Sequence, residues 1–335
     1  MAAYTTIDNP ELYFQTKIYT GDGNDDRNIV FDVTDTSLQP NMLWSARRDS
    51  ADNLSLYDSV RGDGKELRTA ETGAQYDRSD NIQALNSNGF QVGTDGQVNA
   101  SGGTYVSWAW KESATAGFDI LTFEGNSTDD TDISHNLSAV PHWIICRNID
   151  SAKDWCVYHH KNTSAPETDL LVLNTNAATT DSDDKWSDEA PTSSVFTVGD
   201  SSQLNASGNT SIAYLWSEKQ GFSKFGSYIG NGNNDGPFVY TGFRPAWVMC
   251  KGTASNREWV MHDNKRDAEN VVDGTLYANT NDAEGTGTAR MDFLSNGFKL
   301  REDGNNWNAS GETYVYMAFA EAPFVNSNGV PGNAR

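Results

Sequence analysis

Apolar and polar side chains alternate in short runs along most of the chain. In TYVSWAW (104–110), Val106, Trp108 and Trp110 fall on one face of a strand, because successive side chains point to opposite faces. No stretch sustains a 3.6-residue apolar period over three turns. The pattern predicts an all-β protein in which such a bulky face closes the core of its own unit. Two later runs repeat this face: SIAYLW (211–216) and YVYMAF (314–319).

The tetrapeptide NASG precedes each of these three strands, at 99–102, 205–208 and 308–311. Asn tolerates left-handed backbone geometry, and Gly adopts it without steric cost. We therefore expect a tight turn before each central strand, with the Asn and the Gly as its turn-forming residues.

Three prolines provide a second set of repeated landmarks. Each proline begins a strand-like run, and a large apolar residue opens the next run fourteen positions later. In the second and third of these runs, WIIC and WVMC, both faces are apolar, which predicts strands buried on both sides. The prolines are Pro40, Pro141 and Pro245, and the apolar residues are Leu54, Trp155 and Trp259.

The ordered landmarks predict three tandem antiparallel β-sandwich repeats of about 100 residues each, jelly-roll or lectin-like in plan. The first unit covers 16–113, the second 117–219 and the third 221–324. An N-terminal arm (1–15) and a C-terminal arm (325–335) flank them. The joints are only a few residues long, so successive units should sit close together.

Charge and composition narrow the classes of partner. The chain has 46 acidic against 24 basic residues, a formal net charge of -22, and this surface should repel nucleic acid and anionic lipid. It lacks an apolar run of membrane-spanning length and a basic, apolar leader, which predicts synthesis in a cytoplasm. Cys146, Cys156 and Cys250 are too few for a disulfide framework, so we expect structural thiols. Cys156 lies on the strand after that of Cys146 and could come near it by accident of register.

Motifs for catalysis, cofactors or metals are not found. The sequence contains no GxSxG, HExxH, GxxxxGK[ST], GxGxxG or CxxC, so we expect no enzyme, no cofactor and no metal site. A carboxylate pair for glycoside hydrolysis could still lie anywhere among the many acids. The acidic loops at 22–26 and 181–188 lack a complete calcium-loop pattern, which favours solvated loops and leaves calcium undecided. His159 and His262 stand where other units carry Asp or Tyr, which suggests surface or strand-edge roles.

Sugar binding is the most specific chemistry that the residues suggest. Lectin-like sandwiches hold sugars in loops with an aromatic ring and polar groups. Trp186 lies in a polar, acidic segment without a Trp at the corresponding place in the other units, so Trp186, Asp183 and Asp184 are the candidate ligand or partner contacts. The loops at 62–81, 161–191 and 264–290 differ most between units, through either recognition or drift.

Both arms carry apolar residues outside any predicted unit. These are Tyr13 and Phe14 at one end, and Phe324 and Val325 at the other. Such residues would gain stability by docking on a neighbouring subunit, although frayed ends are the alternative.

Several longer phrases resemble repeat-built structural proteins of marine bacteriophages. They include LYDSVRG (56–62), GTLYANTNDAEG (274–285), FLSNGFKLR (293–301) and the ending NASGETYVYMAFAEAPFVNSNGVPGNAR. The resemblance covers nearly the whole chain and is weakest in the second unit, which has SSVF where the others have SNGF. It implies concanavalin-like or SPRY-like sandwiches in a tail fibre or another appendage.

The resulting hypothesis is a non-enzymatic virion protein, a tail-fibre or appendage component that contacts a glycan or protein on the host surface. It would be assembled in the host bacterial cytoplasm with other virion proteins, as a homo-oligomer with a trimer favoured, without nucleic acid or membrane insertion. The alternatives are a capsid-decorating protein without a receptor role and a polysaccharide-degrading tail enzyme.

Overall fold

The computed structural model describes residues 3–32, 36–254 and 256–332, so the outermost residues of both predicted arms lie outside it. The fold is all-β, as predicted, and every sheet is built from antiparallel strands. Helices are limited to short turns, and no helix in these three ranges is long and apolar enough to cross a membrane.

The first unit forms two sheets. The larger has the strand order β1-β9-β3-β4-β5-β6 and the smaller β2-β8-β7. Strand β1 starts before the predicted boundary, so the end of the N-terminal arm belongs to the first sheet. The elements are η1 (Pro10–Leu12), β1 (Phe14–Thr20), β2 (Arg27–Val30), β3 (Met42–Arg47), β4 (Ser55–Asp58), β5 (Lys65–Arg68), β6 (Tyr76–Asp77), β7 (Ile82–Asn86), β8 (Gly89–Val92), α1 (Gly96–Asn99) and β9 (Thr104–Trp110).

The second unit forms a larger sheet of order β10-β17-β12-β13-β14-β15 and a smaller pair, β11-β16. As in the first unit, the first and last long strands pair with each other. Its elements are β10 (Phe118–Glu124), β11 (Thr131–Ser134), β12 (Trp143–Asn148), β13 (Cys156–His159), η2 (Pro166–Thr168), β14 (Asp169–Val172), β15 (Thr180–Asp181), α2 (Asp183–Trp186), β16 (Val195–Val198) and β17 (Thr210–Trp216).

The third unit forms a larger sheet of order β18-β25-β20-β21-β22 and a smaller one of order β19-β24-β23. Its first strand again pairs with its last, which in turn pairs with the strand that contains the landmark proline. Its elements are β18 (Ser223–Ile229), β19 (Phe238–Tyr240), β20 (Phe243–Gly252), β21 (Val260–Asp263), β22 (Leu276–Tyr277), β23 (Met291–Leu294), β24 (Gly297–Leu300) and β25 (Thr313–Pro323).

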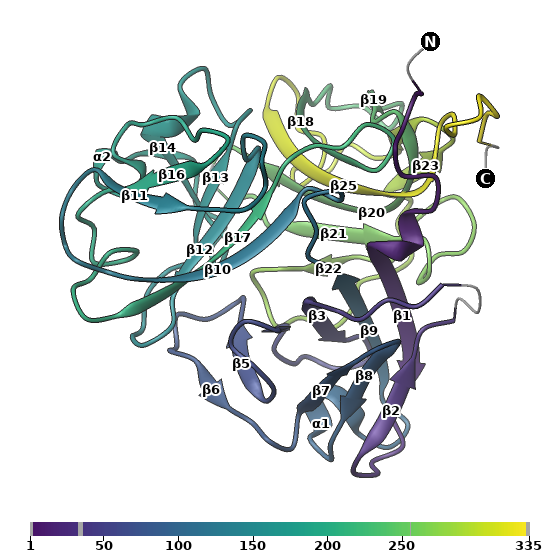
Figure 1. Ribbon diagram of the computed structural model, residues 1–335. Coiled ribbons are helices and arrows are strands. Elements are labelled where there is room, and N and C mark those ends of the chain that lie inside the picture. Colours follow the sequence, from purple (N-terminus) through teal and green to yellow (C-terminus); the bar gives the residue numbers. More distant parts are fainter. Residues whose placement is uncertain (1–2, 33–35, 255, 333–335) are drawn as a thin grey trace.

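The three larger sheets surround one shared core (Figure 1). The bulky faces of β9, β17 and β25 point into it, so the expectation that each closes the core of its own unit was wrong. Trp110 of the first unit lies 5.5 Å from Trp247 and 5.6 Å from Phe319 of the third, between ring centroids. Eight of the ten Trp residues belong to this core: Trp44, Trp108, Trp110, Trp143, Trp155, Trp216, Trp247 and Trp259.

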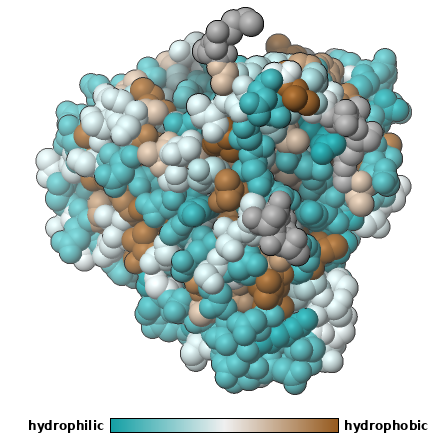
Figure 2. All heavy atoms as spheres, turned by 45° about the vertical axis from the view of Figure 1, so that its right-hand side comes forward, coloured by the Kyte–Doolittle hydropathy of each residue, from teal (hydrophilic) through white to brown (hydrophobic). Residues whose placement is uncertain are grey.

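The other face of each larger sheet packs against the smaller sheet of the same unit. Leu215 of β17, for example, joins Phe196 of β16 in the core of the second unit. Strands β12 and β20 are buried on both sides, as WIIC and WVMC predicted. The outer surface is mostly hydrophilic on the face shown in Figure 2, where hydrophobic residues form small separate groups. Three outer cores thus surround one central core.

The NASG asparagine works as a buried clamp. Asn205 is completely buried, and its side-chain amide donates to the carbonyls of Thr128 and Gly199 while its oxygen accepts the Asn126 N–H. Asn99 and Asn308 hold the same two loops in their own units. The prediction that the Asn takes left-handed geometry was therefore wrong, whereas the closing glycines do have positive φ.

We expect Asn205→Ala to lower the free energy of unfolding by about 2–3 kcal/mol, because the Gly199 carbonyl and the Asn126 N–H would lose their hydrogen bonds to this buried side chain. Urea denaturation of the full chain measures this loss. Asn209→Ala, a change in the same turn outside the clamp, is the matched control. Equal stability of the Asn205→Ala variant and the parent protein would contradict the clamp.

Equivalent backbone hydrogen bonds close the three units into a ring. Each runs from a loop of one unit to the carbonyl eight residues after the landmark proline of the next unit. The third bond leads from the third unit back to the first, so the ring has no free end. The bonds are Gln75 N–H to Ile149 O (2.8 Å), Thr179 N–H to Thr253 O (2.9 Å) and Glu284 N–H to Arg48 O (2.9 Å).

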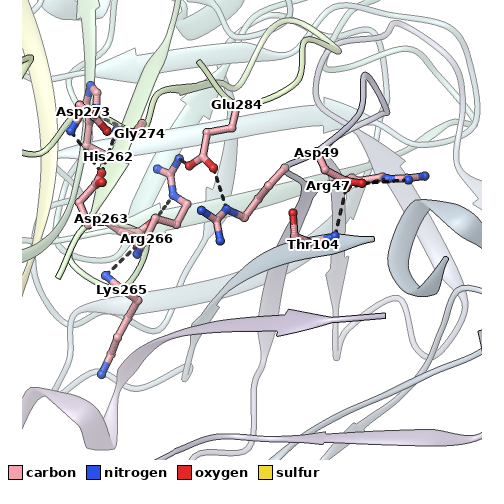
Figure 3. A network of polar contacts seen from close by, with 12 residues as sticks. Arg47, Asp49, Thr104, His262, Asp263, Lys265, Arg266, Asp273, Gly274 and Glu284 are labelled. Atoms are coloured by element: carbon pink, nitrogen blue, oxygen red, sulfur yellow. Dashed lines mark hydrogen bonds and ion pairs between the residues drawn. The ribbon is translucent and has the colours of Figure 1, made fainter. Parts of the chain in front are cut away.

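The donors of these bonds lie in the three most variable loops. Each loop meets a different neighbour, which gives a structural reason for their different sequences. Glu284 illustrates this role, because its carboxylate accepts from Arg266 Nη1 (2.7 Å) and from Arg48 Nε (2.8 Å) across the joint between the third and first units (Figure 3). Contact between units thus explains part of the sequence variation in these loops, for which the sequence alone suggested either recognition or drift.

The joints also carry buried polar contacts at one repeated position. Asp58 accepts from the Tyr214 hydroxyl (2.6 Å), and Asp263 accepts from Trp108 Nε1 (3.0 Å). His159 takes this position in the second unit and lies 3.3 Å from the carbonyl oxygen of the third unit's Tyr316. All three position-equivalent residues are completely buried, so the predicted surface or strand-edge role was wrong for His159.

His262 is likewise a core residue. Its Nδ1 faces the Gly274 carbonyl at 3.0 Å, and its Nε2 accepts from Trp307 Nε1 at 2.9 Å. Burial lowers the pKa of His262 to about 3, so the ring is neutral at physiological pH. The predicted surface role is therefore wrong for His262 as well.

The three cysteines are buried free thiols, as predicted. Cys146 and Cys156 lie directly opposite each other on β12 and β13, and burial raises the pKa of Cys156 to about 12. We expect mass spectrometry of freshly purified protein to find three free thiols, and alkylation to require unfolding. A bridge between Cys146 and Cys156 in such a sample would contradict this prediction.

Candidate functional site

A glutamate at the end of each central strand faces the next unit. Glu112, Glu218 and Glu321 each follow the last bulky aromatic of their strand by two residues. The residue that each meets on the next unit differs, so the three joints have different chemistry. The partners are Asp119 at the first joint and Lys224 at the second, whereas Glu321 pairs with Arg244 of its own unit and only shares a cavity with Gln15 at the third joint.

The second joint opens into a groove of about 510 Å³ between the second and third units. Residues from both units and from the N-terminal segment line it. Its walls combine two phenol rings with an imidazole, a carboxylate, an amine, an amide and hydroxyl groups. The lining residues are Tyr4, His142, Glu218, Gln220, Ser223, Lys224, Tyr240, Thr241 and Gly242.

The charged groups of this groove are already paired. Lys224 Nζ lies 2.7 Å from Glu218 Oε2, and the other oxygen of Glu218 accepts the Phe225 N–H at 3.0 Å. His142 Nδ1 accepts the backbone N–H of Glu218 at 3.1 Å. The groove therefore offers fixed hydrogen-bonding groups with little net charge.

His142, which lines the groove, and the adjacent His160 are both neutral. The rings of His142 and His160 meet edge to face with centroids 4.4 Å apart. Burial lowers the pKa of both, that of His160 to about 4, and His160 Nε2 lies 2.6 Å from the Phe225 carbonyl oxygen, which makes it the protonated nitrogen. Neutral imidazoles here serve as hydrogen-bonding groups.

Tyr240 forms the outer wall of the groove. Its hydroxyl lies 3.2 Å from the hydroxyl of Tyr4, which donates to the Gly242 carbonyl at 2.8 Å. Burial and the neighbouring Tyr240 raise the pKa of Tyr4 to about 12, so the Tyr4 phenol stays neutral at physiological pH. The N-terminal segment thus contributes to a wall of this groove.

Strand β19 carries a second exposed aromatic beside Tyr240. Phe238 and Tyr240 are 46% and 53% exposed, and both point outward because they lie two residues apart. The pairing registers identify the equivalent outward positions in the other units. Those positions hold Asn28 and Val30 in the first unit, and Asp132 and Ser134 in the second.

The structure does not bring the predicted contact residue Trp186 to the surface. Its side chain is 2% exposed and packs against Tyr158 in the core of the second unit, with ring centroids 6.1 Å apart. Asp183 and Asp184 lie beside it on α2, where Asp184 pairs with Lys185 at 2.6 Å. Trp186 is therefore not available for stacking on a ligand. The polar and acidic residues around Trp186 lie on the outward side of the single helical turn that buries the indole.

The acids near α2 line an open hollow together with Asp129, Asp188 and Asp200. These carboxylates repel one another. Burial and the surrounding acids raise the pKa of Asp188 above its usual value. Among the residues that the structure describes, no group of three or more His, Cys, Asp or Glu is arranged to hold a metal ion.

The predicted assembly arms dock on their own chain. Phe14 is buried in the central core, stacked on Phe319 with centroids 5.2 Å apart. Tyr13 contacts Phe222, and Phe324 contacts Tyr4. Val325 is half-buried and bridges to Pro331. These side chains make contacts within their own chain, and docking of the arms on a neighbouring subunit stays a prediction.

The first joint contains two carboxyl groups that share a hydrogen bond. Burial, followed by the contact with Asp119, raises the pKa of Glu112 to about 7 from an ordinary 4.5. A raised folded-state pKa stabilises the protein below the unfolded-state value, and this stability is lost as the pH rises through 7.

We therefore expect Glu112→Gln to raise the free energy of unfolding by about 1–2 kcal/mol at pH 8, after allowance for solvent screening, and by much less at pH 4. Urea denaturation at both pH values measures the difference. Glu321→Gln, at the equivalent position but paired with Arg244, is the comparison, and it should give no gain in stability at pH 8. A gain that is equal at pH 4 and pH 8 would contradict a shared proton.

One protein family model matches nearly the whole chain, over residues 9–323, and it is described as a domain of unknown function (DUF7483). The chain belongs to the DUF7483 family. The match includes all three units and their joints, so the DUF7483 region corresponds to the closed ring as a whole. A comparison with curated proteins finds no significant match.

Sequence reasoning missed the groove in this DUF7483 protein because its residues come from two units and the N-terminal segment. The available signal lay in the comparison of the units. Phe238 and Tyr240 are aromatic at two strand positions where the other units carry small, polar or aliphatic residues. His142 similarly follows Pro141 where the other prolines are followed by Asn41 and Ala246.

Proposed function

We propose that the protein is a non-enzymatic structural component of a bacteriophage virion, part of a tail fibre or another appendage, and that it contacts the host cell surface. The groove at the second joint carries this proposal. It combines an exposed aromatic ring with neutral hydrogen-bonding groups, the composition with which proteins hold sugars and other hydroxylated ligands.

A rigid scaffold supports the same proposal. The central core and the closed ring of joints hold residues of two units in one fixed arrangement around the groove. A preorganised groove loses little entropy when it binds a ligand. The units surround a common centre and do not form a linear array (Figure 1).

The proposal also includes contacts with other virion proteins and a homo-oligomeric state, with a trimer favoured. Both follow from the resemblance to structural proteins of marine bacteriophages. Several copies would bind a repetitive host glycan more tightly than one copy. The acidic surface requires that charges at a subunit contact be paired or screened, so association should strengthen at sea-water ionic strength.

Labelling on virus particles tests the location. An antibody against the purified protein should decorate tail appendages in electron micrographs, and the protein should bind host cells at sea-water salt. Decoration of the capsid without host binding would instead favour the capsid-decorating alternative. Release of reducing ends from host polysaccharide would favour the enzyme alternative. Absence of the protein from purified particles would overturn the proposal.

A further inference from the structure

The aromatic face of β19 begins at the groove. Tyr240 belongs to both, because its side chain lines the groove and also lies on the outward face of the strand. Phe238 follows on the same face, about 7 Å farther along the strand. Together the two rings form a strip that leads from the second joint onto the surface of the third unit.

This strip is a feature of one unit only. The position-equivalent residues of β2 and β11 are Asn28 and Val30, and Asp132 and Ser134. An outward aromatic pair is therefore not required by the sandwich, which forms in all three units. A requirement of the fold would apply at every copy of the strand, so the pair points to a role outside folding.

Charge restricts the ligand. Lys224, in the groove, is neutralised by Glu218, and Lys299, opposite Phe238 on β24, pairs with Asp235 at 2.7 Å. The whole chain carries a formal net charge of -22. An anionic polymer would meet long-range repulsion from this net charge, whereas an uncharged polymer would not.

We propose that the groove and the outward face of β19 bind an extended, uncharged polysaccharide segment, with one sugar ring on Tyr240 and a second on Phe238. The carbon–hydrogen faces of sugar rings pack on aromatic rings, which bury apolar area at low conformational cost. The hydroxyl groups of the first sugar would meet His142, Gln220 and Thr241 in the groove. This inference rests on the proposed host-surface contact and specifies its ligand class and position.

The test uses the full chain and soluble polysaccharides of defined charge. The probes are dextran, laminarin and galactomannan as uncharged polymers, alginate as an anionic polymer and chitosan oligomers as a cationic one. Affinity electrophoresis and calorimetry measure binding. We expect binding to at least one uncharged polymer, little change between low and high salt, and none to alginate.

Variants of the two aromatic residues on β19 locate the binding site. Tyr240→Ala and Phe238→Ala should each weaken binding at least tenfold, which corresponds to about 1.4 kcal/mol. Val30→Ala, at the position of the first unit that is equivalent to Tyr240, should leave the affinity unchanged. Both strand positions are exposed, and unchanged denaturation curves would show that the fold is retained.

Failure to bind every uncharged polymer, binding to alginate or chitosan alone, or equal affinity of the parent and the two β19 variants would each overturn this inference. The electron-microscopy test of the proposed function is independent of these results. A protein found on tail appendages that binds none of the uncharged polymers would retain its proposed function and lose this ligand. A protein absent from particles that still binds through β19 would do the reverse.

Discussion

Replacing Asp263 by alanine is expected to lower the free energy of unfolding by about 3–5 kcal/mol, because it removes the partner of a buried cation. The side chains of Asp263 and Arg266 are both completely buried, and Arg266 Nε lies 2.5 Å from Asp263 Oδ2. The same carboxylate accepts from Trp108 of the first unit, so the change also breaks a contact at the joint that closes the ring. Glu284 remains as a second partner of Arg266 and limits the loss. Urea denaturation of the full chain measures it.

The chain itself suggests the rescue variant. The second unit has His159 and Asn162 where the third has Asp263 and Arg266, so the position accepts a neutral pair. We expect the double variant Asp263→His with Arg266→Asn to be more stable than Asp263→Ala. A single variant that loses less than about 1 kcal/mol would mean that the ion pair does not hold this joint.

Trp110→Ala is the second change with a large expected effect, a loss of about 3–5 kcal/mol. The indole is buried at the centre of the ring, where it contacts Phe14 of its own unit and Trp247 and Phe319 of the third. Because the units share this core, the cavity should destabilise all three together. Calorimetry should show one unfolding transition, shifted to lower temperature.

Hydrogen exchange distinguishes a shared core from independent units. In the Trp110→Ala variant, amide protection should fall in β9, β17 and β25 alike. Trp216→Ala should give the same pattern from the second unit. Val30→Ala, an exposed change in the first unit, should alter stability by less than about 0.5 kcal/mol. Loss of protection confined to the first unit would mean that the three units unfold separately.

The period-two pattern was sufficient to predict the strands, and the apolar runs after the prolines were sufficient to predict burial on both sides of β12 and β20. These features depend on local sequence, because a strand reveals its faces by alternation. The same local reasoning failed at Trp186. Its neighbours are polar and acidic, yet one turn of α2 directs the indole inward.

The candidate site was outside the reach of local reasoning for a related reason. His142 and Tyr240 are separated by almost one complete unit in sequence. Tyr4 and Tyr240 are separated by more than two units. They line one groove only because the joint between the second and third units brings them together. Their chemistry was visible in the sequence, whereas their proximity was not.

The sequence alone determined the all-β class, the spacing of the landmarks and the bulky face of each central strand. Only the tertiary structure decided which neighbour that face meets. A row such as Val106, Trp108 and Trp110 specifies burial, but burial is non-directional, and a core within one unit or between three satisfies it equally. The choice came from directional contacts across the joints, such as Asp58 with Tyr214, whose partners lie about 100 or more residues apart. Hydrogen bonds of this kind depend on geometry that a linear pattern does not contain.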